Sequence, residues 1–256
     1  MSTAIQNFAV ANLRRRPEVA EVAGFVVGFD PTTTSSYINF ATPLPGISPT
    51  EADIAALVTA FHERGLVPRL EFAPDAAPEV APALRRAGFG TEAVQEYLVC
   101  RPGGLIAPPD GPLVLTPRTD EEYAAIDAAL CEAFGGEDEP SPEGAARLRR
   151  TQETGGAIRY AAGLGAGAGV AEGAGCSGAG ICSPVAEGTA ELAGIGTRPE
   201  CRGRGVAAAV TAALTRAAFD EGAASAWLEA SGGGSRRVYE RLGYRATGTR
   251  LYLTLA

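Results

Sequence analysis

Apolar residues recur at helical spacing within residues 48–65, SPTEADIAALVTAFHERG. We expect a helix here, with Ser48 as N-cap, Pro49 at the first helical position and Glu51 at the third. Gly65 is the expected stop. The face that this helix should bury consists of Ile54, Leu57, Val58 and Phe61.

The same pattern returns in residues 119–136, TDEEYAAIDAALCEAFGG, where Thr119 and Glu122 have the spacing of a capping box. The expected apolar stripe consists of Tyr123, Ile126, Leu130 and Phe134. A third helix is predicted within residues 141–155, SPEGAARLRRTQETG.

Two stretches near the ends of the two halves of the chain resemble each other at one constant offset. Residues 83–89, ALRRAGF, lie 155 positions before residues 238–244, VYERLGY. Residues 96–100, EYLVC, lie 155 positions before residues 251–255, LYLTL. Each is preceded by a helix that ends in glycine and by a strand, so we expect two copies of a helix, strand, helix, strand unit. Chance similarity between amphipathic helices is the alternative.

Residues 101–112, RPGGLIAPPDGP, suit neither a helix nor a central strand and are interpreted as a linker. We therefore expect two domains, residues 1–105 and residues 113–256. The fold class expected is α/β (α+β), with a mixed, largely antiparallel sheet flanked by helices in each half. Residues 161–182 are so rich in glycine that a poorly packed hairpin is the most that they indicate.

Composition limits the possible functions. The chain has 256 residues, 46% of them hydrophobic and 20% charged, with a formal charge of -8. This charge argues against general nucleic-acid binding, because phosphate contacts need clustered cations. No apolar span long enough for a membrane and no secretory signal is evident, so a cytoplasmic protein is expected. The five cysteines contain no C-x-x-C pair, so neither a metal site nor a disulfide framework is predicted.

The segment most informative about function is GIGTRPECRGRGVAAAV, residues 194–210. Residues 189–197 are expected to form a strand and residues 205–222 a helix, with an arginine-rich and glycine-rich loop between them. A helix that starts with glycine leaves its first N–H groups bare, and its N-terminus carries about half a positive charge. Arg202 and Arg204 add to that charge, so the loop is predicted to hold a pyrophosphate.

These residues resemble the signature of the GNAT superfamily of acyl-CoA-dependent N-acetyltransferases, Q/R-x-x-G-x-G/A. The resemblance covers about residues 113–256, and YERLGY resembles the segment in which that family has a functional tyrosine, here Tyr239. The first half resembles a degenerate relative, as in tandem proteins of that superfamily; it has no such loop, and the position of Tyr239 is Leu84. Where many members have an asparagine at the last helix, this chain has Gly232. The signature positions are matched by Arg202, Gly203, Arg204, Gly205, Val206 and Ala207.

The resemblance implies direct transfer of an acetyl group from acetyl-CoA to a primary amine, without an acyl-enzyme and without a metal. Glu191 is the candidate general base, and Tyr239 is the candidate acid for the leaving thiolate. The amides of Ile195, Gly196 and Thr197 are candidates to stabilise the thioester oxygen. The acceptor is expected to be a small-molecule or peptide amine, and the protein a monomer or homodimer.

Other interpretations remain open. Residues 203–208, GRGVAA, also fit the dinucleotide fingerprint G-x-G-x-x-A, with Glu229 as the ribose-binding acid, although only 27 residues follow it. A non-catalytic module that binds acyl-CoA is a further possibility. Tyr239 could be a packed aromatic side chain and Glu191 an exposed carboxylate. His62 is expected to have a surface or capping role, and Cys201 to be inert.

Overall fold

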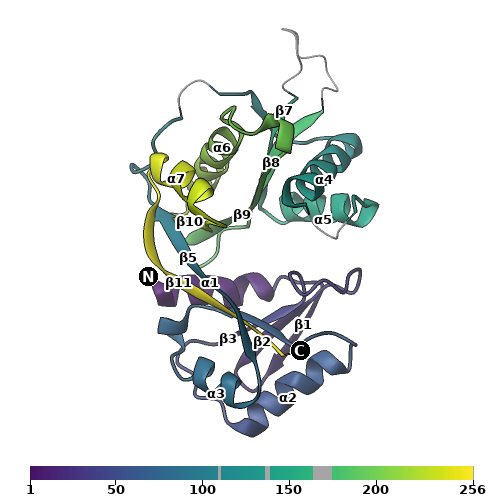
Figure 1. The fold of residues 1–256 in the computed structure, drawn as a ribbon, viewed down its shortest axis with the longest axis vertical. Helices are drawn as coiled ribbons and strands as arrows, with labels where there is room; N and C mark the ends of the chain where they lie inside the picture. Colours follow the sequence, from purple (N-terminus) through teal and green to yellow (C-terminus); the bar gives the residue numbers. More distant parts are fainter. Residues whose placement is uncertain (109–110, 136–138, 164–174, 256) are drawn as a thin grey trace. The chain divides into compact units, whose positions relative to one another are not determined.

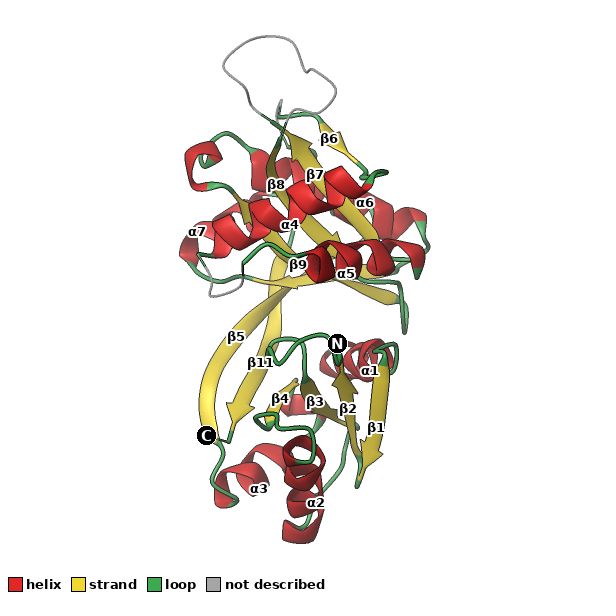
Figure 2. Ribbon diagram, turned by 90° about the vertical axis from the view of Figure 1, so that its right-hand side faces the viewer, coloured by secondary structure: helices red, strands yellow, loops and turns green. Residues whose placement is uncertain are grey.

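The structure is a computed structural model that describes residues 1–108, 111–135, 139–163 and 175–255. It divides into two compact units, one made of Met1–Tyr97 with Ala246–Ala256 and the other of Leu98–Arg245 (Figure 1). Helices flank a mixed, largely antiparallel sheet in each unit (Figure 2), which confirms the expected fold class. No helix in these residues is long and apolar enough to cross a membrane.

The first unit has its strands in the order β1-β2-β3-β4-β11-β5, and only the β3–β4 pair among the first four is parallel. Phe25 and Phe29 point toward α2 and α3, whereas Val26 packs with α1 on the other face. The elements are α1 (Ser2–Leu13), β1 (Glu18–Val22), β2 (Phe25–Phe29), β3 (Phe40–Pro43), α2 (Glu51–His62), β4 (Arg69–Phe72), η1 (Pro74–Ala76), α3 (Val80–Arg86), β5 (Gly90–Cys100) and β11 (Arg245–Thr254).

The start of α2 corrects the sequence prediction. The helix begins at Glu51 with Thr50 as N-cap, not at Pro49 with Ser48 as N-cap. The reason is a reciprocal capping box, in which the Thr50 side chain accepts from the Asp53 N–H and the Asp53 side chain accepts from the Thr50 N–H. The buried face agrees with the prediction at Ile54, Leu57 and Phe61, while Val58 is half-buried.

The parallel strands β3 and β4 pair at one position, Ala41 with Leu70, and then separate. Gln6 of α1, which is fully buried, bridges them beyond that point. Its Nε2 atom donates to the Pro43 carbonyl oxygen at 2.6 Å, and its Oε1 atom accepts from the Ala73 N–H at 2.9 Å. The side-chain amide thus replaces a backbone connection between the two strands.

The second unit has the strand order β5-β10-β9-β8-β7-β6, in which β9 and β10 are parallel and the pairs from β9 to β6 are antiparallel. Figure 1 shows α6 and α7 on one face of this sheet and α4 and α5 on the other. Its elements are β6 (Val114–Leu115), α4 (Asp120–Phe134), α5 (Pro142–Glu153), β7 (Ala157–Ala162), β8 (Cys176–Cys182), β9 (Thr189–Thr197), η2 (Pro199–Cys201), α6 (Val206–Asp220), β10 (Ser225–Glu229) and α7 (Gly233–Arg241).

The capping box predicted for α4 is confirmed. Thr119 and Glu122 form the capping box of α4, and Ser141 accepts from the Gly144 N–H at the start of α5. Phe134, expected in the apolar stripe of α4, is instead 59% exposed at the end of the helix. Of the glycine-rich hairpin, β7 and the strand β8 pair as expected, while residues 164–174 lie outside the described residues.

The order of elements agrees with the internal repeat, since α2, β4, α3 and β5 correspond to α6, β10, α7 and β11. The compact units do not follow the two sequence copies at their last strands. Residues 246–256 belong to the first unit because β11 pairs antiparallel with β4, from Leu251 opposite Phe72 to Thr254 opposite Arg69. The domain ranges 1–105 and 113–256 refer to the two copies of the repeat in the sequence, and they stay a prediction.

Candidate active site

The loop between β9 and α6 has the backbone that its glycines predict. Gly203 has a φ of 76° and Gly205, the N-cap of α6, has a φ of 78°. Other residues rarely adopt this left-handed conformation. A side chain at either position would meet no atom within 4 Å, so the space beside the loop is open to a ligand. The N–H groups of the first turn, from Val206 onward, have no acceptor within the helix.

The two arginines of the loop have different surroundings. The Arg202 guanidinium donates to the carbonyl oxygens of Ala133, at 3.0 Å, and Thr197, at 3.4 Å, so it ties the loop to the last turn of α4. Arg204 is exposed, and no other described residue forms a hydrogen bond or ion pair with its side chain. Of these two arginines, Arg204 is therefore the one whose side chain can turn toward a ligand without breaking a contact.

A third arginine, Arg198, was not among the residues that the sequence singled out. It forms an ion pair with Glu132 of α4, and its Nε atom donates to the Cys176 carbonyl oxygen at 2.7 Å. It thereby holds the start of the loop on β8 and α4. Its position directly before Pro199 was the only signal available, and its two partners are distant in sequence.

The strands β9 and β10 separate next to this loop. Their parallel register runs from Thr189 opposite Ser225 to Leu192 opposite Leu228, while β9 continues to Thr197 paired with β8 but not with β10. The Arg198 N–H donates to β8, so the alternation of a strand directs the backbone groups of Thr197 to the edge that β10 has left. The Thr197 Oγ1 atom is buried and has no partner among the described residues.

Close packing of α4 explains Gly196. A methyl group there would lie 2.8 Å from the Ala133 Cβ atom and 3.0 Å from a Leu130 methyl group. Ile195 is half-buried and packs against the core beneath α6. The three residues expected to offer amides thus lie where β9 runs between α4 and α6.

Tyr239 of α7 is 6% exposed and belongs to the core between the sheet and α6. Burial raises the pKa of its hydroxyl to about 12, so this group stays protonated at neutral pH. Its ring lies 6.3 Å from that of Tyr244, whose hydroxyl is hydrogen-bonded to Thr215. No described residue forms a hydrogen bond with the Tyr239 hydroxyl, which is therefore available to a ligand.

Glu191 lies in the paired part of β9, one residue before the last pair with β10. Its neighbours Ala190 and Leu192 face the same core as Tyr239, so its side chain points to the other face of the sheet. Its N–H donates to the Ser183 hydroxyl at 2.9 Å. The two candidate catalytic side chains therefore do not share one face.

The remaining residues singled out in the sequence have simple settings. His62 is exposed in the last turn of α2, which agrees with the surface position expected for it, and Cys201 is buried in η2. Gly232 is the N-cap of α7; its backbone is extended, and a side chain there would meet no atom within 4 Å. Residues 1–108, 111–135, 139–163 and 175–255 contain no group of three histidine, cysteine or acidic side chains that could hold a metal ion.

Comparison with known proteins agrees with this geometry. Residues 123–244 match the family described as the acetyltransferase (GNAT) family. No protein with a curated description matches the chain.

Solved structures are similar over nearly the whole chain. A GCN5-related N-acetyltransferase from Kribbella flavida is 24% identical, with a TM-score of 0.77 over 99% of this chain and 95% of its own. A GCN5-related N-acetyltransferase from Sphaerobacter thermophilus is 14% identical, with a TM-score of 0.60 over 90% of this chain and 76% of its own. A tandem GNAT protein from the clavulanic acid biosynthesis pathway is 12% identical, with a TM-score of 0.57 over 98% and 94%. At these identities the likeness concerns the fold.

Proposed function

We propose that this protein is an acyl-CoA-dependent N-acetyltransferase that transfers an acetyl group to a primary amine by direct attack. The observation that carries the proposal is the separation of β9 from β10 beside the glycine loop of α6. One feature offers a strand edge that β10 does not cover, and the other offers an anion site. The pyrophosphate of acetyl-CoA matches the anion site, and its amide-bearing arm matches the strand edge.

The residues present fit this co-substrate. The N–H groups at the start of α6, around Val206 and Ala207, would bind the pyrophosphate together with the Arg204 side chain. Gly203 and Gly205 allow the close approach, and Arg202 adds positive charge while it holds the loop on α4. The Thr197 N–H at the open edge would donate to the arm as a neighbouring strand would. Acetyl-CoA, when bound, supplies the acetyl group as an activated thioester.

Two side chains of this protein would carry out the proton transfers of the reaction. We propose that Glu191, through a water molecule, removes a proton from the attacking amine on its face of the sheet. Tyr239, on the other face, donates its proton to the departing thiolate. Its raised pKa keeps the hydroxyl group protonated before that step. The amides of residues 195–197 stabilise the thioester oxygen as negative charge develops. A base and an acid on opposite faces suit a reaction that takes place between two separated strands.

We propose that the first unit has no co-substrate site and serves a structural or substrate-shaping role. Its separated parallel strands are joined by Gln6, whose amide uses the backbone groups of Pro43 and Ala73. The loop before α2 also lacks arginine. One co-substrate site per chain is therefore expected, in a cytoplasmic protein that acts on a small-molecule or peptide amine.

Two alternatives can be separated from this proposal. In a dinucleotide enzyme the glycine turn follows the strand directly, whereas η2 lies between the strand and the glycines here. The sheet of a dinucleotide enzyme is mostly parallel, whereas the sheet of this unit is largely antiparallel. A non-catalytic acyl-CoA module would bind CoA and release none from acetyl-CoA.

The test is release of CoA from acetyl-CoA in the presence of a panel of primary amines, including polyamines, aminosugars and peptides with a free N-terminus. We expect at least one amine to accelerate release, and Glu191→Gln to reduce that rate with CoA affinity unchanged. Release that no amine accelerates, together with retained CoA binding, would favour the non-catalytic module.

A further inference from the structure

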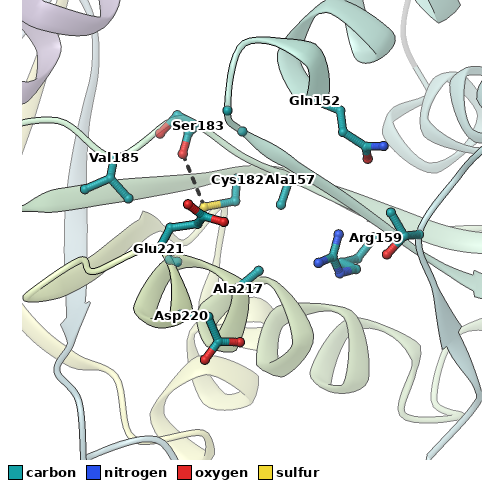
Figure 3. Close-up of a pocket in the computed structure, with 13 residues that line it drawn as sticks. Gln152, Ala157, Arg159, Cys182, Ser183, Val185, Ala217, Asp220 and Glu221 are labelled. Carbon is teal, nitrogen blue, oxygen red and sulfur yellow. Dashed lines mark hydrogen bonds between the residues drawn. The ribbon is translucent and has the colours of Figure 1, made fainter.

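A pocket of about 360 Å³ lies at the C-terminal end of α6 in the second unit. It is formed by the end of α5, the start of β7, the end of β8 and the last turn of α6 (Figure 3). Since α6 has 15 residues and a helix rises about 1.5 Å per residue, this pocket is about 20 Å from the glycine loop. None of the residues proposed above for acetyl transfer lines it.

One side of the pocket is negative for two reasons. The helix α6 ends at Asp220 with Glu221 as C-cap and has no basic residue in its last turn, so both carboxylates lie at the negative end of the helix dipole. The corresponding helix α2 instead has His62 in its last turn. Neither carboxylate forms an ion pair with another described residue. Acidic residues are unfavourable at the C-terminal end of a helix, and such unfavourable placements are expected at functional sites.

The neighbouring wall adds to this negative potential. The Gln152 side chain donates through Nε2 to the Pro117 carbonyl oxygen, and its Oε1 atom is buried with no partner among the described residues. The partial negative charge of that oxygen is therefore uncompensated on this side.

The other side of the pocket has a cation, Arg159 of β7. Its Nη1 atom donates to the Ile158 carbonyl oxygen at 2.8 Å, and no carboxylate among the described residues pairs with it. A guanidinium has five N–H groups, so most of them remain for a ligand. Figure 3 shows Arg159 and Glu221 on opposite sides of the pocket.

We propose that this pocket binds a free α-amino acid. The ammonium group would face Glu221 and Asp220, and the carboxylate would accept from Arg159 as a charge-assisted pair. The small apolar residues Ala157, Ala217 and Val185 would receive the side chain. A lone cation would leave Arg159 without a counter-ion, and a lone anion would face two carboxylates, so a zwitterion fits the charges best.

The test is titration calorimetry on the full chain without CoA, so that its result does not depend on the proposed acetyl transfer. The probes are L-valine, L-glutamine and L-lysine, and we expect at least one to bind with a micromolar to millimolar Kd. The amide of that amino acid, which lacks the carboxylate, and its deaminated acid, which lacks the ammonium, should each bind at least about tenfold more weakly. Absence of binding by all three probes, or equal binding by either analogue, would overturn the proposal.

Two variants locate the site. Arg159→Gln and Glu221→Gln should each weaken binding by about tenfold to a hundredfold, because each removes one charge-assisted pair. Arg216→Gln, which changes an exposed arginine of α6 outside the pocket, is the matched control and should leave the Kd unchanged. Circular dichroism checks the fold, and Arg159→Lys, which keeps the charge, replaces Arg159→Gln if the latter unfolds. Unchanged affinity in the folded pocket variants would contradict the assignment.

Discussion

The Nε2 atom of Gln6 donates a 2.6 Å hydrogen bond to the carbonyl oxygen of Pro43, where β3 separates from β4. In the second unit the corresponding strands, β9 and β10, separate after Leu192 with no such side chain described between them. The same strand arrangement is thus closed by the chain itself in one unit and offers backbone groups to a ligand in the other. This difference underlies the proposal that only the second unit binds acyl-CoA.

Gln6→Leu should destabilise the protein by about 2 to 6 kcal/mol. The substitution keeps the volume of the side chain but leaves the Pro43 carbonyl and the Ala73 N–H buried without partners, each at about 1 to 3 kcal/mol. Urea unfolding measures the change. Gln95→Leu, at a half-buried position of β5, is the control and should cost less than about 1 kcal/mol. Equal effects would mean that the Gln6 bridge does not matter.

Arg204→Ala should weaken CoA binding by about 1.5 to 3 kcal/mol, the usual size of hydrogen bonds to a charged group. Arg202→Ala should weaken it less, because the Arg202 guanidinium is engaged by the carbonyl oxygens of Ala133 and Thr197. Loss of the Arg202 side chain should instead lower the melting temperature, because this side chain holds the loop on α4. Calorimetry and thermal unfolding of both variants decide the order, and a larger binding loss in Arg202→Ala would reverse the assignment.

Tyr239→Phe should lower kcat by about a hundredfold while the KM for acetyl-CoA stays near its original value. The variant keeps the ring that packs the core beneath α6, and it removes the acid that protonates the thiolate. Steady-state kinetics with any accepted amine provides the measurement. If kcat does not change, Tyr239 has only a packing role.

Stability should fall at alkaline pH through the buried tyrosines. An unfolded tyrosine has a pKa of about 10, whereas burial raises the pKa of Tyr239 to about 12. The folded state binds this proton more tightly, so the stabilisation is complete below about pH 10 and is lost as the pH rises toward 12. A difference of two pKa units corresponds to about 3 kcal/mol.

Denaturant unfolding at about pH 8 and about pH 11 tests this pH dependence. Tyr239→Phe should lose less stability between the two than the parent protein does. Tyr37→Phe, at a side chain that is 71% exposed, is the control and should behave like the parent. A slope that is the same in all three proteins would exclude a contribution from Tyr239.

Local signals in the sequence were sufficient for most elements of the fold. The Thr119 and Glu122 pair marked the start of α4, and the glycines of residues 203–205 marked a loop whose φ angles require them. At α2 two overlapping capping signals competed, and Thr50 with Asp53 prevailed because both of its hydrogen bonds form. Such choices depend on a few adjacent residues.

Contacts between distant segments could not be predicted in this way. The pairing of β11 with β4 depends on a partner about 180 residues earlier, which the pattern of residues 251–255 does not encode. The attachment of Arg202 to Ala133 and the opposite faces of Glu191 and Tyr239 likewise follow from the packing of helices on the sheet. The candidate site could therefore be predicted as a set of residues but not as a geometry.

Titration of the full chain with CoA by calorimetry, followed by the same titration with NADH, tests the proposed co-substrate site most directly. Residues 1–105 alone would lack β11, which belongs to the first unit, so the full chain is the proper sample. We predict one CoA site per chain, no binding of NADH, and a weaker site in Arg204→Ala. Binding of NADH without CoA, or two equivalent CoA sites per chain, would contradict the proposal.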